Sequence, residues 1–235
     1  MNDWNNQDSQ DMEPDDDVSF DDETPDNSTS EGSASLPAYR GATNDPFFGL
    51  LIAGAVSIGL MPLAESDPDL RYTLTWGLLA GFAVLSWLMG NFPRITEEQP
   101  EDLAWGIVFG LILGIPLLAF GTGLLSEISN LVFPSFGLGT ALAYLVFVMP
   151  LGETLFFRGI LQQLRAFWEV GLIATVWGLV LFFPLINTGP YPLIVALILA
   201  MTNILYGYVR LRNGLAAAWL CQIMVNLVVF FIPFI

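Results

Sequence analysis

From residue 46 onward, apolar segments about as long as a membrane span alternate with short polar or turn-rich links. A bilayer hydrocarbon core about 30 Å thick needs about 20 mostly apolar helical residues to cross it. Segments of this kind cover residues 47–64, 72–91, 103–125, 137–157, 170–187, 191–209 and 214–234. They predict an all-α fold, a polytopic membrane helix bundle of about seven transmembrane helices.

The composition is typical of a protein embedded in a lipid bilayer, and it excludes several kinds of chemistry. Hydrophobic residues make up 54% of the 235 residues and charged residues 13%, whereas soluble domains carry nearer a quarter charged residues. All seven basic residues are arginine, so histidine metal ligands, Ser-His pairs and lysine Schiff bases are excluded. A single cysteine, Cys221, excludes an internal disulfide and a multi-cysteine metal site. The net charge of −16 argues against nucleic acid as a partner. We therefore expect no cofactor and no bound metal.

The acidic residues gather in an N-terminal tail, residues 1–45, which precedes a transmembrane domain at 46–235. The tail holds 13 of the 23 acidic residues and one basic residue, Arg40. Its few apolar residues cannot offset the entropy of ordering, so it is predicted to be disordered. We interpret it as a solubilising tail, with a docking or cation-binding role as the alternative. Abundant acidic residues without lysine also suggest a salt-rich, halophilic cytoplasm.

The arginines predict the orientation in the cell membrane. If the tail lies on one side, that side also receives the links after the second, fourth and sixth segments. It then holds Arg40, Arg94, Arg158, Arg165, Arg210 and Arg212, and the opposite side holds Arg71. Because positive residues stay in the cytoplasm, the N-terminus is predicted to be cytoplasmic and the C-terminus outside.

Polar residues at membrane depth are candidate site residues, because burying them costs free energy unless they are paired or hydrated. Glu153 and Arg158 lie five residues apart, about 1.4 turns, so they do not stack directly, although the arginine can bend back. A structural carboxylate beside a snorkelling arginine is the alternative. Asn187 closes an apolar segment, and Gln222 and Asn226 share one face of the last helix. For these amides, hydrogen bonding between helices is the alternative.

Two prolines lie three residues before polar candidates: Pro150 before Glu153, and Pro184 before Asn187. In a regular helix each frees the carbonyl four residues earlier, here Val146 and Val180. Freed backbone at this depth is tolerated where it is buried in protein or lines a wet cavity. Both breaks therefore favour a cavity beside the candidates.

These residues resemble the motifs of the CPBP family of intramembrane proteases, the CAAX prenyl endopeptidase and bacteriocin-processing (Abi) group. The family pattern is Glu-Glu-x-x-x-Arg, then Phe-x-x-x-His, then His-x-x-x-Asn or Asp on successive helices. Residues 153–158 are similar to the first motif, with Thr154 replacing the second Glu. The second is similar to 183–187, with Asn187 replacing His, and the third to 222–226, with Gln222 replacing His and Asn226 retained. The resemblance covers residues 140–230.

The resemblance implies a site made of Glu153, Arg158, Asn187, Gln222 and Asn226. In the family, the first Glu is thought to activate a water, and the histidines and Asn to hold a metal or stabilise an oxyanion. Neutral amides are weak zinc ligands, so a metalloprotease is excluded on chemistry.

Three functions remain open. The first is an inactive family member that binds a lipidated or membrane-embedded peptide or protein. The second is a metal-free endopeptidase with Glu153 as base and the amides as oxyanion donors. The third is an unrelated, transporter-like protein with an accidental match. The first two require the side chains of Glu153, Asn187, Gln222 and Asn226 to converge. Residues 137–165 must then form one long helix or bend at Pro150, and the fifth segment must be short or tilted.

Overall fold

The computed structural model describes residues 46–89, 98–187 and 189–235, and these contain helices and no strand. The predicted tail at 1–45, with Arg40, and the Arg94 position lie outside the described residues. The helices before the family-like region are α1 (Pro46–Gly59), α2 (Leu63–Ser66), α3 (Pro68–Leu88) and α4 (Pro100–Val132). The later ones are α5 (Leu138–Ala143), η2 (Tyr144–Val148), α6 (Met149–Glu153), η3 (Thr154–Leu161), α7 (Gln162–Leu164), α8 (Phe167–Ile186), α9 (Tyr191–Asn213), α10 (Leu215–Asn226), η4 (Leu227–Phe231) and α11 (Ile232–Phe234).

The predicted membrane helix bundle is confirmed in this part of the chain. The elements from α5 to α7 join into one helix, Leu138–Leu164, and those from α10 to α11 into another, Leu215–Phe234. Together with α4, α8 and α9, they are five helices long and apolar enough to cross a membrane. α1 is a shorter apolar helix, and α3 has 21 residues with two charges near its start.

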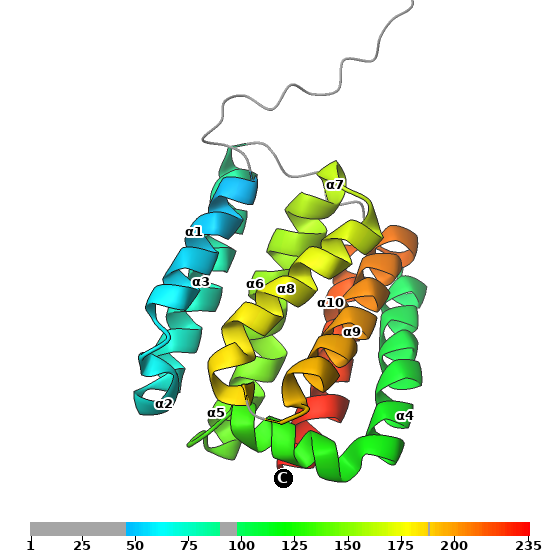
Figure 1. The fold of residues 1–235 in the computed structure, drawn as a ribbon. Helices are drawn as coiled ribbons and strands as arrows, with labels where there is room; N and C mark the ends of the chain where they lie inside the picture. The colour runs from blue at the N-terminus through cyan, green and yellow to red at the C-terminus, as the bar shows by residue number, and fades with distance from the viewer. Residues whose placement is uncertain (1–45, 90–97, 188) are drawn as a thin grey trace, which may run out of the picture. The chain divides into compact units, whose positions relative to one another are not determined.

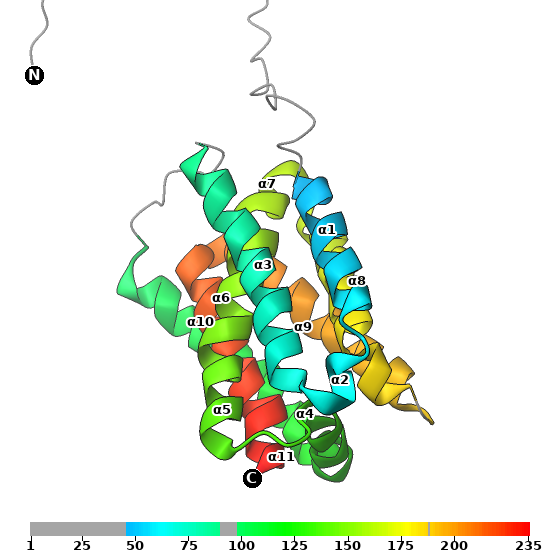
Figure 2. The same ribbon diagram turned by 90° about the vertical axis from the view of Figure 1, so that its left-hand side faces the viewer.

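The helices alternate in direction, so the links gather at two ends (Figures 1 and 2). The end of α3, the beginning of α4 and the links before α8 and α10 lie at one end, called here the arginine end. The α1–α3 link, the α4–α5 link, the α8–α9 link and the C-terminus lie at the other. This alternation is the one that the apolar segments predict.

A line of glycines on α4 packs this helix against α10. Gly106, Gly110 and Gly114, which we call the glycine seam, are buried and spaced four residues apart. A Cβ at Gly106 would overlap the Ala217 carbonyl oxygen, and one at Gly110 would lie 2.7 Å from Met224 Cβ. Small residues at this spacing let two membrane helices approach closely.

Helix α4 is long but not straight. Figure 1 shows that its first part runs along the bundle and its later part crosses the end opposite the arginine end. Pro116 lies inside the helix, where it removes a backbone hydrogen bond and commonly produces a kink. The bend brings Leu125, Ile128 and Val132 into the buried core.

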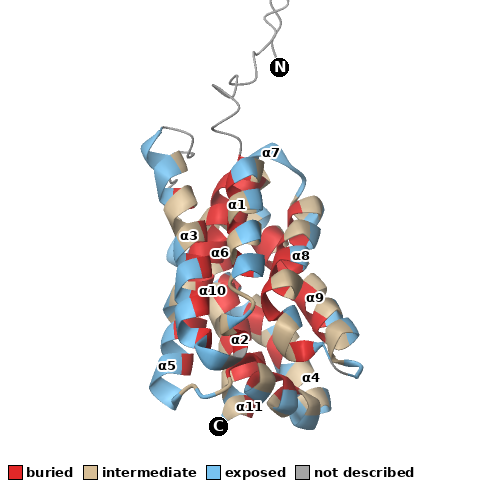
Figure 3. Cartoon of the chain, turned by 60° about the vertical axis from the view of Figure 1, so that its left-hand side comes forward, coloured by how far each residue is buried: buried red, intermediate tan, exposed pale blue. Residues whose placement is uncertain are grey.

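Buried residues lie in the interior of the bundle and exposed residues on its outer surface (Figure 3). The core joins aromatic residues of α3, such as Tyr72 and Trp76, to the later helices. Many large apolar side chains remain exposed, among them Phe120 and Leu193 at 94% and 78%. An apolar exterior over long apolar helices is the pattern of a protein solvated by lipid.

The beginning of α10 is fixed by a residue far away in sequence. The carboxylate of Glu98, just before α4, accepts hydrogen bonds from the backbone N–H groups of Ala216 and Ala217 at 3.0 and 3.1 Å. Gly214, with φ of 102°, leaves room for it, since a Cβ there would overlap Glu98. The carboxylate accepts hydrogen bonds from N–H groups that have no partner within the helix. Its negative charge also interacts favourably with the positive end of the helix dipole.

Candidate functional site

Glu153 lies in the middle of the 138–164 helix, and both oxygens of its buried carboxylate accept hydrogen bonds. The indole Nε1 of Trp76 donates to Oε1 at 3.1 Å. The amide Nε2 of Gln222 donates to Oε2 at 2.7 Å. Donors from α3 and α10 therefore hold this carboxylate in the bundle interior.

Gln222 uses both ends of its amide. Besides donating to Glu153, it accepts a hydrogen bond at Oε1 from the Thr154 hydroxyl at 2.9 Å. Glu153 and Thr154, adjacent in the first motif, thus both contact the residue that begins the third motif. The expected proximity of these two motifs is present, and it takes the form of hydrogen bonds between helices.

Arg158 is buried, with 1% of its surface exposed, so the snorkelling alternative is wrong. Its guanidinium donates to Asn203 Oδ1 on α9 and to the Glu153 backbone oxygen, the latter at 3.4 Å. It also lies over the Tyr206 ring, 5.1 Å from the centroid. It forms no ion pair with the Glu153 carboxylate, because among the described residues the single salt bridge joins Arg165 and Glu169.

A π-helical segment explains how Arg158 meets Glu153. η3 begins directly after Glu153 and runs to Leu161. In a π-helix the hydrogen bonds join residues five apart, so such residues follow one another along one face. The arginine side chain bends back toward Glu153, as the sequence allows. The arginine reaches the backbone oxygen and not the carboxylate.

A second π-helical segment explains the role of Asn226. In η2 the Met149 N–H donates to the Tyr144 oxygen, five residues back. Continuing this pattern, the N–H of residue 150 would donate to Leu145, but Pro150 has none. The side-chain amide of Asn226 donates to the Leu145 oxygen instead, at 3.0 Å. A neighbouring helix therefore supplies a donor to the Leu145 carbonyl, one residue before the Val146 carbonyl of the prediction.

Asn187 does not join the other candidates. It follows the last residue of α8 and is exposed. Convergence requires a short helix here, but α8 runs its full length to Ile186. At 1.5 Å per residue, it lies about 14 Å further along the bundle than Glu153. Phe183 is exposed too, whereas Phe182 and Ile186, with the same four-residue spacing, are buried. The inward face of α8 at the second motif is thus apolar.

Two partners of the site, Asn203 and Trp76, are not among the residues predicted from the sequence. Asn203 is a buried polar residue in an apolar segment, and the rule that singled out Gln222 could have found it. Trp76 carries no such signal, because an indole is common in membrane helices and its role depends on where α3 packs. α3 lies against α6 and η3.

The side chains around Glu153 do not fit a catalytic zinc. Such a site takes three ligands from His, Cys, Asp and Glu. The contacts of Glu153 are an amide N–H and an indole N–H, which donate hydrogen bonds. No group of three such ligands occurs in the described parts of the chain. No step through a metal is derived for this site.

Comparison with known families agrees with the motifs. Residues 135–228 match the family model described as type II CAAX prenyl endopeptidase Rce1-like. Comparisons with curated proteins and with solved structures gave no match. The matched segment includes Glu153, Arg158, Gln222 and Asn226, and it leaves out α1, α3 and α4. This match argues against an accidental resemblance. Residues 135–228 are therefore similar to this family, and the rest of the chain lies outside the match.

Proposed function

We propose that this protein is a pseudoprotease of the CPBP family, which binds a lipidated or membrane-embedded peptide or protein without cleaving it. One observation carries the proposal: both inward-facing amides of the motifs are already bound within the protein. Gln222 donates to Glu153. Asn226 donates to the Leu145 backbone oxygen.

Oxyanion stabilisation needs donors aimed at the position where negative charge develops. Gln222 and Asn226 would have to leave their present acceptors to serve in that way. Asn187, the third predicted donor, is exposed at the end of α8. None of the three supports an arranged oxyanion site.

The surroundings of Glu153 also favour a binding protein over an enzyme. A general base must lie within hydrogen-bond reach of the water that it activates. A water at Glu153 competes with the Trp76 indole and the Gln222 amide for the carboxylate oxygens. Arg158 bonds to Asn203 and to the Glu153 backbone, so these residues act together as structural polar contacts.

A cleavage assay in detergent tests the proposal. The purified full chain is incubated with prenylated and unprenylated peptides that end in a CAAX sequence, beside the Glu153→Gln variant. We expect both proteins to bind the prenylated peptide and neither to cleave it above the rate without protein. Turnover by the natural chain that the variant lacks would establish the metal-free endopeptidase instead, and absence of peptide binding would contradict the binding role.

We also propose that the chain lies in the cell membrane with the arginine end in the cytoplasm. Arg165, Arg210 and Arg212 lie at that end and Arg71 at the other, in agreement with the positive-inside rule. Membrane-impermeant thiol labelling of intact cells should reach a cysteine at Asn187→Cys and not at Gln163→Cys. Both positions are exposed, and the natural Cys221 is buried. The opposite labelling pattern would reverse the orientation.

A further inference from the structure

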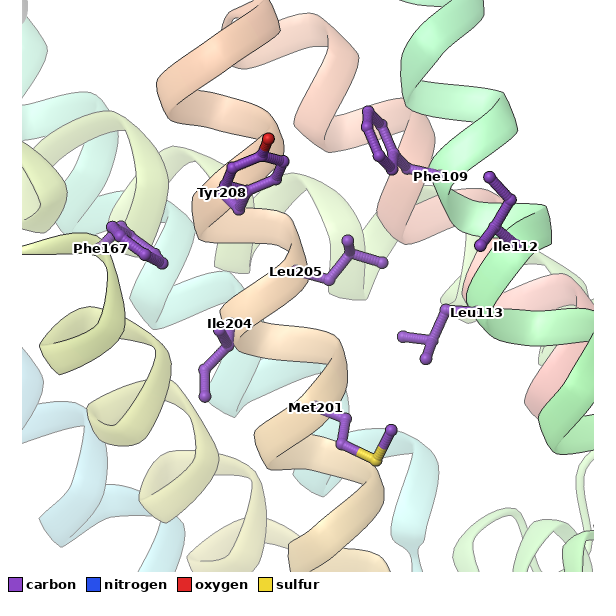
Figure 4. A pocket seen from close by; sticks show the side chains of 8 residues that line it. All are labelled: Phe109, Ile112, Leu113, Phe167, Met201, Ile204, Leu205 and Tyr208. Atoms are coloured by element: carbon purple, nitrogen blue, oxygen red, sulfur yellow. The ribbon is translucent and has the colours of Figure 1, made fainter.

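An apolar groove lies between α4 and α9, outside the polar site. It consists of two adjoining hollows of about 520 and 370 Å³, which share Ile112, Leu113 and Met201 as lining residues. Figure 4 shows the larger hollow, with side chains of α4 and α9 on its two sides. Ile112 and Met201 are 62% and 42% exposed, so this α4–α9 groove opens on the outer surface of the bundle.

The packing of α4 explains why the groove exists. The glycine seam turns the small residues of α4 toward α10. The larger residues Phe109, Ile112 and Leu113 lie on the side of α4 that faces α9. Because these side chains are large, α4 and α9 cannot approach each other as closely as α4 and α10. In a lipid-facing position, such a groove matches the shape and polarity of an acyl chain.

One end of the groove carries a cation at the level of the membrane surface. Tyr208 lines the groove, and its hydroxyl accepts a hydrogen bond from Arg212 Nη1 at 3.0 Å. Arg212 is exposed in the last turn of α9. Trp105 and Trp168, both 51% exposed, lie near the starts of α4 and α8 at this same end. Tryptophan and tyrosine gather where hydrocarbon meets headgroups.

Two of the acidic residues near this end, Glu98 and Asp102, are already bound within the protein. Glu98 accepts from the α10 backbone, and Asp102 accepts from Asn213 at 3.1 Å. Arg212 is a charged group that contacts a side chain lining the groove, and it complements a negative headgroup. Basic positions between membrane helices at the cytoplasmic surface bind acidic lipids in this way.

We propose that the α4–α9 groove binds one anionic phospholipid. An acyl chain lies against Ile112, Leu113 and Met201, and the phosphate contacts Arg212. The proposal does not depend on whether the Glu153 site is active, since Glu153, Gln222 and Asn226 lie on helices that do not line the groove.

Native mass spectrometry of the detergent-solubilised full chain tests this assignment. Phosphatidylglycerol and phosphatidylcholine with identical acyl chains are offered at equal concentration. We expect the phosphatidylglycerol adduct to exceed the other by about fivefold, the effect of one arginine near the surface. Arg212→Gln should make the two adducts nearly equal, and Met201→Trp, which fills the groove, should reduce both.

Arg165→Gln is the matched control, because Arg165 is exposed at the same end but pairs with Glu169. It should leave both adducts unchanged. Arg212 is exposed, so its variant keeps the fold and decides the question even if Met201→Trp unfolds. Equal adducts in the natural chain, or a preference that Arg212→Gln does not change, would overturn the proposal. So would a dimer that Met201→Trp dissociates while lipid adducts persist, because the groove would then bind a second copy.

Discussion

The two faces of α10 make contacts of opposite character. One face packs Ala217, Cys221 and Met224 against the glycine seam of α4, with backbone and aliphatic contacts alone. The other face presents Gln222 and Asn226 to the 138–164 helix through hydrogen bonds. We call Glu153, Thr154, Gln222 and Asn226 the polar seam. The first contact involves a helix outside the family-matched segment, and the second lies within it.

The two contacts have different roles: one drives the association of the helices, and the other fixes their register. In a bilayer, close packing of small residues drives helix association, and a hydrogen bond between helices contributes about 0.6 kcal/mol on average. The glycine seam can therefore hold α10 in place along its length. The polar seam fixes the rotation and height of α10 relative to Glu153, because each hydrogen bond joins one pair of atoms. Four changes test this division of roles.

Gly106→Ala should have the largest effect. Its Cβ would overlap the Ala217 carbonyl, which is backbone and cannot rotate away, so α4 and α10 must separate. Overpacking of this kind costs about 3 kcal/mol. Thermal unfolding in detergent measures it. Gly123→Ala, on the same helix with nothing within 4 Å of its Cβ, is the control. Equal stability of the two variants would refute the glycine seam.

Gln222→Met should cost about 2 kcal/mol, because it removes the amide donor of the buried Glu153 carboxyl and leaves Thr154 without its acceptor. Replacing both partners, as in Glu153→Met with Gln222→Met, should cost less than Gln222→Met alone, since no carboxylate is then left underbonded. Unfolding curves of the three proteins give the comparison. A double variant that is the less stable would show that Glu153 stabilises the bundle by other contacts.

Asn226→Ala should cost about 1 kcal/mol, the value of a typical hydrogen bond, by leaving the Leu145 carbonyl without a donor. In a Pro150→Ala background the backbone supplies that donor, so the same change should cost much less. A double-mutant cycle on unfolding free energies measures the coupling. Additive effects would mean that Asn226 does not replace the N–H that Pro150 lacks.

Thr154→Val should have the smallest effect, about 0.6 kcal/mol, because it removes one neutral hydrogen bond to the Gln222 amide and nearly conserves the side-chain volume. The same unfolding measurement applies, with Thr122→Val as control, since the Thr122 hydroxyl bonds to its own helix. A loss as large as that of Gln222→Met would place Thr154, not Glu153, at the centre of the polar seam.

Hydropathy predicted the helices well, because span length depends on bilayer thickness and not on which residues touch. The family motifs predicted that Glu153 and Gln222 approach, since two motifs on successive helices share a site. The sequence could not show that Asn187 lies apart from Glu153, because two overlapping frames, 182–186 and 183–187, both begin with phenylalanine. The packing of α8 shows that the first of these frames faces inward, because Phe182 and Ile186 are buried. The five-residue turns after Glu153 and before Pro150 also escape a pattern based on 3.6 residues per turn.

The Glu98 contact with the start of α10 has a consequence for how the chain is made. Glu98 and the seam glycines of α4 are synthesised more than 100 residues before the helix that they contact. During translation, α4 therefore emerges before α10 has been synthesised, and the glycine seam then has no α10 to pack against. The contact between α4 and α10 can therefore form only after α10 has been released, and a chain truncated before α10 leaves the glycine seam uncovered in the lipid.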